Sequence, residues 1–177
     1  MKMKNEIRFS APWSVGVKII TVLGTALLLG VSFIGSRTMP ESEPLAARLV
    51  VTLLPLVVLL VTLPFIVRGY VIANGELFIE RLGWQNHFSL ADVVSVEANP
   101  DAMRWSLRLF GDGGLFGYFG WFWNRKLGTY RAYGTNPKNT VVIKLTNRTI
   151  VVTPHDPARF VEEILWQLKP ADGMLEN

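Results

Sequence analysis

Two long uncharged runs near the N-terminus constrain the fold of this chain more than any other feature. Eighteen residues without a charge lie between Lys18 and Arg37, and nineteen lie between Arg48 and Arg68. At 1.5 Å rise per residue, helices of this length reach about 27 and 29 Å, close to the hydrocarbon thickness of a bilayer. A buried helical hairpin of a soluble protein is the alternative. Two such runs within 177 residues favour a transmembrane hairpin instead.

The charges around these runs give the hairpin a direction. Basic residues lie before the first run and directly after the second, at Lys2, Lys4, Arg8, Lys18 and Arg68. The short connection at 36–44 contains Arg37 and two acidic residues, Glu41 and Glu43, and Arg48 lies at its far edge. The positive-inside rule therefore predicts that both termini are cytoplasmic. Trp13 and Tyr70 lie near the ends of the runs, where interfacial aromatic anchors belong.

From residue 68 onward the pattern changes to short strands followed by one helix. Strands are expected near 68–73, 76–82, 92–98, 103–110, 129–134, 139–146 and 148–153. Asn74-Gly75 predicts a two-residue hairpin turn between the first two strands. Asp156 and Pro157 fit the N-cap and first position of an amphipathic helix, in which Phe160, Val161, Ile164, Leu165 and Leu168 share one face. The order is that of a small barrel or sandwich of about seven strands capped by a C-terminal helix.

Three segments of this region resemble the bacterial pleckstrin-homology (PH) domain families. They are GYFG, LGTYRAYGTNPKNTVVI and TPHDPARFVEEI, within a resemblance that covers about residues 68–170. In those families such a domain often follows two membrane helices. The resemblance implies a PH-like fold and a multi-pass protein of the bacterial cytoplasmic (inner) membrane. The expected division is a cytoplasmic segment at 1–14, a transmembrane hairpin at 15–67, a PH-like domain at 68–170 and a tail at 171–177.

One departure bears on the ligand. Phosphoinositide-binding PH domains carry basic residues in and beside the loop that joins their first two strands. Here that loop, residues 73–76, is short and acidic. The sequence therefore argues against phosphoinositide recognition of the familiar kind.

The segment 111–128, GDGGLFGYFGWFWNRKLG, combines glycines, six crowded aromatics and the pair Arg125-Lys126. It is not a phosphate-binding loop, because Phe116 stands where G-x-G-x-x-G needs its third glycine. In one interpretation the aromatics fill a barrel and the glycines allow bends. In the other, a long loop between the fourth and fifth strands inserts Trp and Phe side chains at the bilayer interface. We favour packing for most of them, and a mixed arrangement would turn Trp121 or Trp123 outward.

Basic residues gather in the same part of the chain. Residues 104–148 contain eight basic residues and one acid, Asp112. The candidate contacts for a membrane surface or a partner are Trp121, Trp123, Arg125, Lys126, Arg104, Arg108 and Arg131. Arg104 and Arg108 share strand parity and are expected to point the same way. An ordinary solvated surface is the alternative. Because the domain as a whole is nearly neutral, nucleic acid is not an expected partner.

Signals for catalysis are weak. The chain has no cysteine, and its two histidines, His87 and His155, lie far apart without a metal-binding motif. No serine lies in a nucleophile elbow, and Asp92 and Asp101 form no evident carboxylate pair. We therefore predict no catalytic residues, no metal and no cofactor.

Together these features predict a non-catalytic, membrane-anchored interaction or scaffolding module on the cytoplasmic face. It would bind a protein or peptide partner, or associate with itself, because PH-like barrels have sheet edges that accept an added strand. One alternative is a sensor of anionic lipid surfaces that uses the aromatic segment and the basic residues. The other is a membrane enzyme with an unrecognised site.

Overall fold

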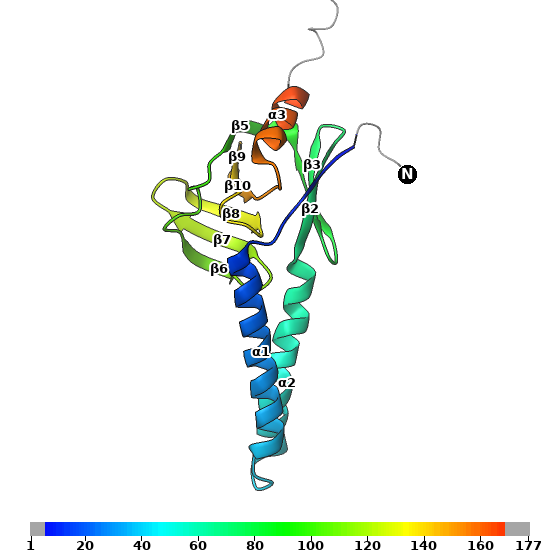
Figure 1. Ribbon diagram of the computed structural model, residues 1–177, viewed down its shortest axis with the longest axis vertical. Coiled ribbons are helices and arrows are strands. Elements are labelled where there is room, and N and C mark those ends of the chain that lie inside the picture. The colour runs from blue at the N-terminus through cyan, green and yellow to red at the C-terminus, as the bar shows by residue number, and fades with distance from the viewer. Residues whose placement is uncertain (1–5, 169–177) are drawn as a thin grey trace, which may run out of the picture.

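The computed structural model describes residues 6–168, which form a long helix pair joined at one end to a β-domain (Figure 1). The first elements are β1 (Ile7–Ser10), α1 (Val15–Thr38), α2 (Leu45–Thr62) and the 3-10 turn η1 (Leu63–Phe65). Both helices are long and apolar enough to cross a membrane, as the sequence predicts. Only 17% and 6% of the residues in their most apolar windows are buried. They are therefore not covered as the core helices of a soluble domain would be.

A four-stranded sheet continues directly from the second helix. Its order is β1-β2-β3-β4, with β2 (Val67–Ala73), β3 (Glu76–Arg81) and β4 (Gln85–Ser89). Asn74 and Gly75 join β2 to β3 with φ angles of 53° and 74°, which confirms the predicted hairpin turn. Because β2 begins beside η1, this turn lies at the end of the domain away from the helices (Figure 1).

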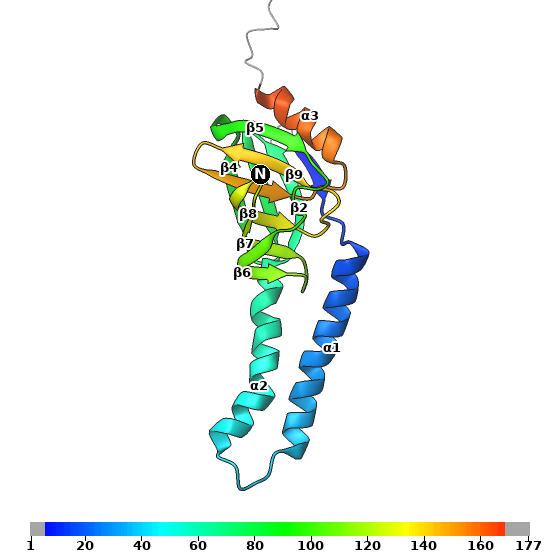
Figure 2. The ribbon, with the colours of Figure 1, turned by 90° about the vertical axis from the view of Figure 1, so that its left-hand side faces the viewer.

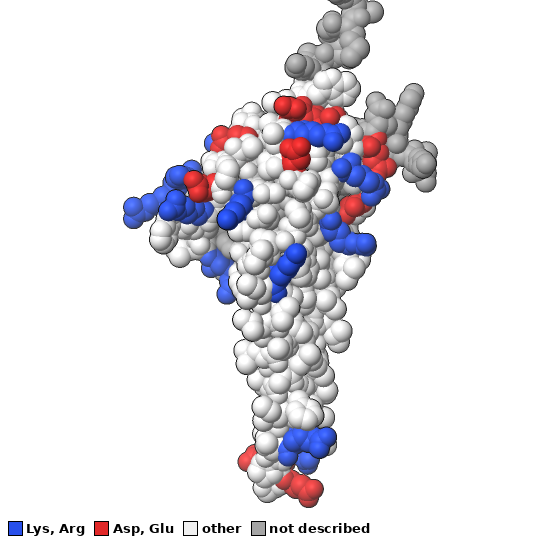
Figure 3. Space-filling model, viewed as in Figure 1, with Lys and Arg blue, Asp and Glu red and all other residues white. Residues whose placement is uncertain are grey.

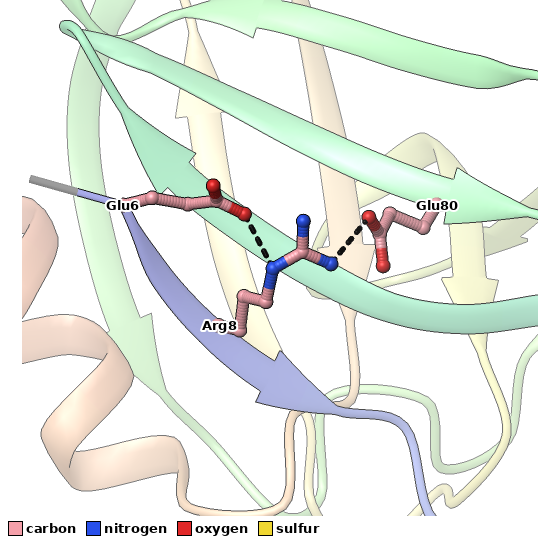
Figure 4. A network of polar contacts seen from close by, with 3 residues as sticks. All are labelled: Glu6, Arg8 and Glu80. Atoms are coloured by element: carbon pink, nitrogen blue, oxygen red, sulfur yellow. Dashed lines mark hydrogen bonds and ion pairs between the residues drawn. The ribbon is translucent and has the colours of Figure 1, made fainter. Parts of the chain in front are cut away.

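Strand β1 precedes α1 and yet belongs to this sheet. It pairs antiparallel with β2, from Ile7 opposite Ile72 to Ser10 opposite Gly69. A Cβ on Gly69 would lie 2.8 Å from the carbonyl oxygen of Phe9, so glycine allows β1 to approach. Arg8 bridges Glu6 and Glu80 of β3 across this junction (Figure 4). The segment before α1 and the segment after α2 therefore lie at the same end of the helix pair.

A six-stranded sheet completes the domain in the order β5-β9-β10-β8-β7-β6. After η2 (Leu90–Asp92), its strands are β5 (Val93–Ala98), β6 (Leu107–Gly113), β7 (Tyr118–Asn124), β8 (Gly128–Gly134), β9 (Val141–Leu145) and β10 (Arg148–Val152). Strands β8 and β10 are parallel and the other neighbours antiparallel. The core between the two sheets includes Tyr70, Tyr133 and Ile143, all buried.

Helix α3 (Pro157–Leu168) closes the core at the end of the domain opposite α1 and α2 (Figure 2). Asp156 caps it as predicted, because its Oδ1 accepts a hydrogen bond from the Arg159 amide at 3.1 Å. Phe160 and Ile164 are buried, and Phe160 meets Phe9 of β1 edge to face at 5.0 Å. Leu165 differs from expectation: its side chain is exposed rather than part of the apolar face.

Three of the ten strands within residues 6–168 are not among the seven expected. They are β1, β4 and β7, which pair mainly with segments far away in the sequence or carry few β-branched residues. The strand expected at 103–110 begins at Leu107, because residues 99–106 form turns instead. The predicted fold class, two apolar helices and a mainly-β domain with a C-terminal helix, is confirmed.

Candidate functional site

The aromatic segment is a strand, not the long loop considered from the sequence. Strand β7 lies between β6 and β8, and its large side chains fall into two environments. Phe119 and Phe122 are buried, whereas Trp121 and Trp123 retain 37% and 38% of their exposure. This is the mixed arrangement, in which phenylalanines pack inside and the two tryptophans reach the surface.

A pair of glycines bends the β6–β7 hairpin. Gly111 and Gly120 lie opposite one another with φ angles of 106° and 120°. A Cβ on Gly120 would lie 2.2 Å from the carbonyl oxygen of Phe110, and one on Gly111 would lie 2.2 Å from that of Phe119. Only glycine allows this conformation and this close approach of the two backbones. The expected role of the glycines in bending the chain is therefore seen here.

The tip of this hairpin packs against the first helix. The amide of Phe116 donates a hydrogen bond to Oγ1 of Thr21 at 2.8 Å, and both residues are buried. Leu115 lies against Gly24, where an added Cβ would be 3.1 Å from its Cδ1. Since the first uncharged run starts after Lys18, the tip lies beside the beginning of the predicted span.

Asp112 shapes this tip. Its Oδ1 accepts hydrogen bonds from the amides of Gly114 and Leu115, each at 2.8 Å. Burial raises the pKa of the Asp112 carboxyl, while these bonds and the charge of Arg108 act in the opposite direction. The side chain therefore acts as a hydrogen-bond acceptor in a partly desolvated position.

An apolar surface covers the edge of the six-stranded sheet. Strand β6 is one of the two edge strands of this sheet and the one nearest the helices (Figures 1 and 2). Its outward side chains are large and apolar: Trp105 just before it is 86% exposed and Phe110 is 77% exposed. We call this surface the apolar edge; it comprises Trp105, Leu107, Leu109, Phe110, Trp121 and Trp123. Trp105 also has a φ of 57°, a strained conformation for a bulky residue.

Three of the predicted basic contacts lie next to the apolar edge. Arg104, Arg125 and Lys126 line a hollow of about 560 Å³ together with Trp105, Leu107 and Trp123. Arg104 lies in the turn before β6, so the parity argument that paired it with Arg108 is wrong. Its guanidinium lies 4.0 Å from the carboxylate of Asp101, and both side chains are largely exposed.

The two remaining basic candidates lie elsewhere. Arg108 lines a separate hollow with Tyr118 and Phe122. Arg131 of β8 is half-buried, with its Cζ 5.8 Å from the ring centroid of Trp121. The predicted residues therefore divide into one cluster of three cations, one pair formed by Arg131 and Trp121, and Arg108 by itself.

The two predicted aromatic anchors have different surroundings. Trp13 is half-buried just before α1, with its ring 6.2 Å from that of Phe116. Tyr70 is fully buried, so its expectation as an interfacial anchor is wrong. Its hydroxyl donates to the carbonyl of Tyr133 at 2.7 Å and accepts from the Thr153 amide at 2.9 Å. Burial raises the pKa of Tyr70 to about 12.

Sequence reasoning missed Trp105, Phe110 and Arg81, because their importance comes from neighbours that the sheets bring together.

Within residues 6–168, no group of three or more His, Cys, Asp or Glu side chains could hold a metal ion. Charged side chains gather over the domain and at the loop end of the helices, and most of the helix pair between them carries none on the face in view (Figure 3).

The arrangement defines a two-sheet, helix-capped domain of the PH type joined to two apolar helices. Residues 68–167 match the family described as Bacterial PH domain, and the chain belongs to this family. No curated protein matches the sequence. PH domains are generally non-catalytic, and membership of this family suggests an interaction module.

Proposed function

We propose that this chain is a non-catalytic module of the bacterial inner membrane whose PH domain lies against the cytoplasmic surface of the bilayer. In this proposal the helix pair spans the membrane, both termini are cytoplasmic, and the apolar edge contacts lipid. The observation that carries the proposal is the exposure of large apolar side chains on β6, the strand of its sheet nearest the helices. Contiguous apolar surface of this kind marks interaction sites, and Trp prefers the membrane interface.

The attachment of the domain to the helices supports this position. Before α1, the Ser14 amide donates to the carbonyl of Thr135 at 3.0 Å, and Thr135 Oγ1 donates to the carbonyl of Pro12 at 2.9 Å. Further along α1, Thr21 accepts the bond from Phe116. These contacts hold the end of β8 and the tip of the β6–β7 hairpin beside the start of the predicted span rather than on a free tether. A domain held in this way keeps the apolar edge close to the lipid headgroups.

The charges support the same position. Arg104, Arg125 and Lys126 flank the apolar edge, and each basic residue near an anionic surface contributes about 1 kcal/mol of attraction. The pairing of β1 with β2 means that the two ends of the helix hairpin are on one side, as the topology predicted from charge requires. Glu41 and Glu43 lie in the connection at the other end, where Arg37 and Arg48 are the basic residues.

Nitroxide labelling of the full chain in anionic lipid nanodiscs tests the proposal. The chain has no cysteine, so Phe110→Cys creates a single labelling position on the apolar edge, and Asn74→Cys creates a control in the turn away from the helices. A label at 110 should relax more with oxygen, which partitions into lipid, than with a water-soluble nickel chelate. The label at 74 should behave in the opposite way. A label at 110 that responds like the label at 74 would refute contact with the bilayer.

A protein partner is the second candidate. Among the described strands β4 pairs only with β3, which leaves one side of β4 free to accept an added strand. A pull-down in mild detergent should then recover a protein with the wild-type chain and lose it when Asn86 in β4 is replaced by proline. Recovery that is unaffected by Asn86→Pro would exclude strand addition at this edge.

A further inference from the structure

Among the described residues, Arg81 is a buried cation without a carboxylate partner. It ends β3 and is 7% exposed, and its Cζ lies 5.0 Å from the ring centroid of Tyr133, 5.4 Å from that of Trp84 and 5.6 Å from that of Phe65. Within residues 6–168 its Nε has no hydrogen-bond partner, and no ion pair involves it. Burial lowers the pKa of Arg81, and the nearby positive charge of Arg131 adds to this effect. Burying a cation in this way is costly unless an anion compensates it.

A second arginine faces the same ring. The Cζ of Arg131 lies 5.2 Å from the ring centroid of Tyr133 and 5.8 Å from that of Trp121. Its Nε is also buried without a partner among the described residues. Two guanidinium groups that share one aromatic ring repel each other, while each presents a planar set of donors suited to a phosphate or carboxylate.

Both arginines line one hollow of about 380 Å³. Its lining includes Val61, Thr62 and Phe65 from the end of the second candidate span, together with Phe119 of β7. The Phe65 and Phe119 rings stack at 5.1 Å. This hollow therefore combines two cations with apolar walls that continue into the predicted transmembrane segment.

Asp112 is the single acidic residue lining this hollow. Its Oδ1 is already occupied by the amides of the hairpin tip, and Arg108 is the cation that acts on its pKa. The Asp112 carboxylate therefore does not neutralise the positive charges of Arg81 and Arg131.

We propose that this hollow binds one anionic phospholipid, with the phosphate diester between Arg81 and Arg131 and the acyl chains along the end of α2. The inference rests on the proposed position of the domain against the bilayer. Apolar walls and the end of a span favour a lipid over a soluble phosphate. The site differs from the turn at Asn74-Gly75, which lies at the other end of the domain.

Native mass spectrometry of the full chain in detergent tests this site. The wild type is titrated with phosphatidylglycerol, with phosphatidylcholine and with soluble glycerol phosphate, beside Arg81→Gln, Arg131→Gln and the control Arg159→Gln on the exposed side of α3. We expect the wild type to retain one phosphatidylglycerol in preference to phosphatidylcholine. Because charge-assisted hydrogen bonds are lost, both hollow variants should weaken this binding about tenfold or more, and the control should not.

The outcomes separate the site from the proposed function. Folded variants that retain phosphatidylglycerol like the wild type would overturn the site, as would equal retention of both lipids. Equally tight binding of glycerol phosphate would assign the anion to a soluble ligand and overturn the lipid. Since Arg81 is buried and its variant is prone to misfold, Arg131→Gln and the thermal shift produced by phosphatidylglycerol provide an independent measurement. A nitroxide label at Leu107→Cys, on the apolar edge but outside this hollow, reports contact with the bilayer whichever result is obtained.

Discussion

One hydrogen bond between Thr21 and Phe116 joins the tip of the β6–β7 hairpin to the first helix. The Phe116 amide donates to Thr21 Oγ1 at 2.8 Å in a buried position. Thr21→Val keeps nearly the same volume but removes the acceptor, so the amide loses its partner. An unsatisfied buried donor costs about 1–3 kcal/mol, and more where lipid excludes water. The substitution should therefore favour an opened hairpin tip without unfolding the domain.

This cost translates into a measurable exchange rate. Because about 1.36 kcal/mol changes an equilibrium tenfold, a loss of 1–3 kcal/mol should raise the opened population about 5- to 160-fold. Hydrogen–deuterium exchange of a peptide covering residues 113–118, in full-length protein in nanodiscs, reports this opening. The control is Thr25→Val, the same substitution one turn further along α1.

Two results would refute the reasoning. Exchange in the hairpin tip that is unchanged by Thr21→Val would mean that this bond does not hold the tip. An equal acceleration by Thr25→Val would mean that the helix itself, rather than the bond, is affected. Exchange in β10, far from the contact, should stay the same in every variant because the core is untouched.

Three further perturbations test the fold. Gly120→Ala should lower the free energy of unfolding by at least about 2 kcal/mol, because its Cβ would clash with a backbone oxygen at 2.2 Å. The Cβ of Gly128→Ala would meet no atom within 4 Å, so thermal denaturation should show a smaller loss of stability for this variant. Tyr70→Phe should cost about 1–3 kcal/mol through two lost buried hydrogen bonds. Because the folded pKa of Tyr70 is raised to about 12, wild-type stability should fall as pH rises from about 10 to about 12, and chemical denaturation of the Phe variant should lack this component. Because burial raises the pKa of the Asp112 carboxyl, wild-type stability should decline as pH rises above the ordinary carboxyl pKa of about 4, and Asp112→Asn, which keeps the Oδ1 acceptor, should remove this decline. Asp112→Ala should destabilise the hairpin tip at every pH, and denaturation curves across pH 4–8 separate the two variants.

Much of the fold is predictable because local signals specify it. The two uncharged runs specify the helices, Asn74-Gly75 specifies the first hairpin of the domain, and Asp156 specifies the start of α3. Each signal depends on residues close together in the sequence. The resemblance to the bacterial PH families adds the overall arrangement of strands, which the family match confirms.

The rest depends on contacts between distant segments. Nothing local identifies Ile7–Ser10 as a strand, because its partner β2 lies beyond both helices. Tyr70 follows the second run closely, which suggests an interfacial anchor, but the sheet turns its side chain into the core. Arg81 gains its chemistry from Tyr133, Trp84 and Phe65, which come from separate elements.

These long-range contacts also decide which part of the chain constitutes the functional unit. Strand β1, which precedes the helices, supplies the edge of one sheet, and Thr21 of α1 holds the hairpin tip. Phe65, in the turn that follows α2, forms part of the wall around Arg81 and Arg131. A domain cut out at residue 68 would lose all three contributions. The helices are therefore part of the proposed site as well as its anchor, and lipid binding has to be measured on the full chain.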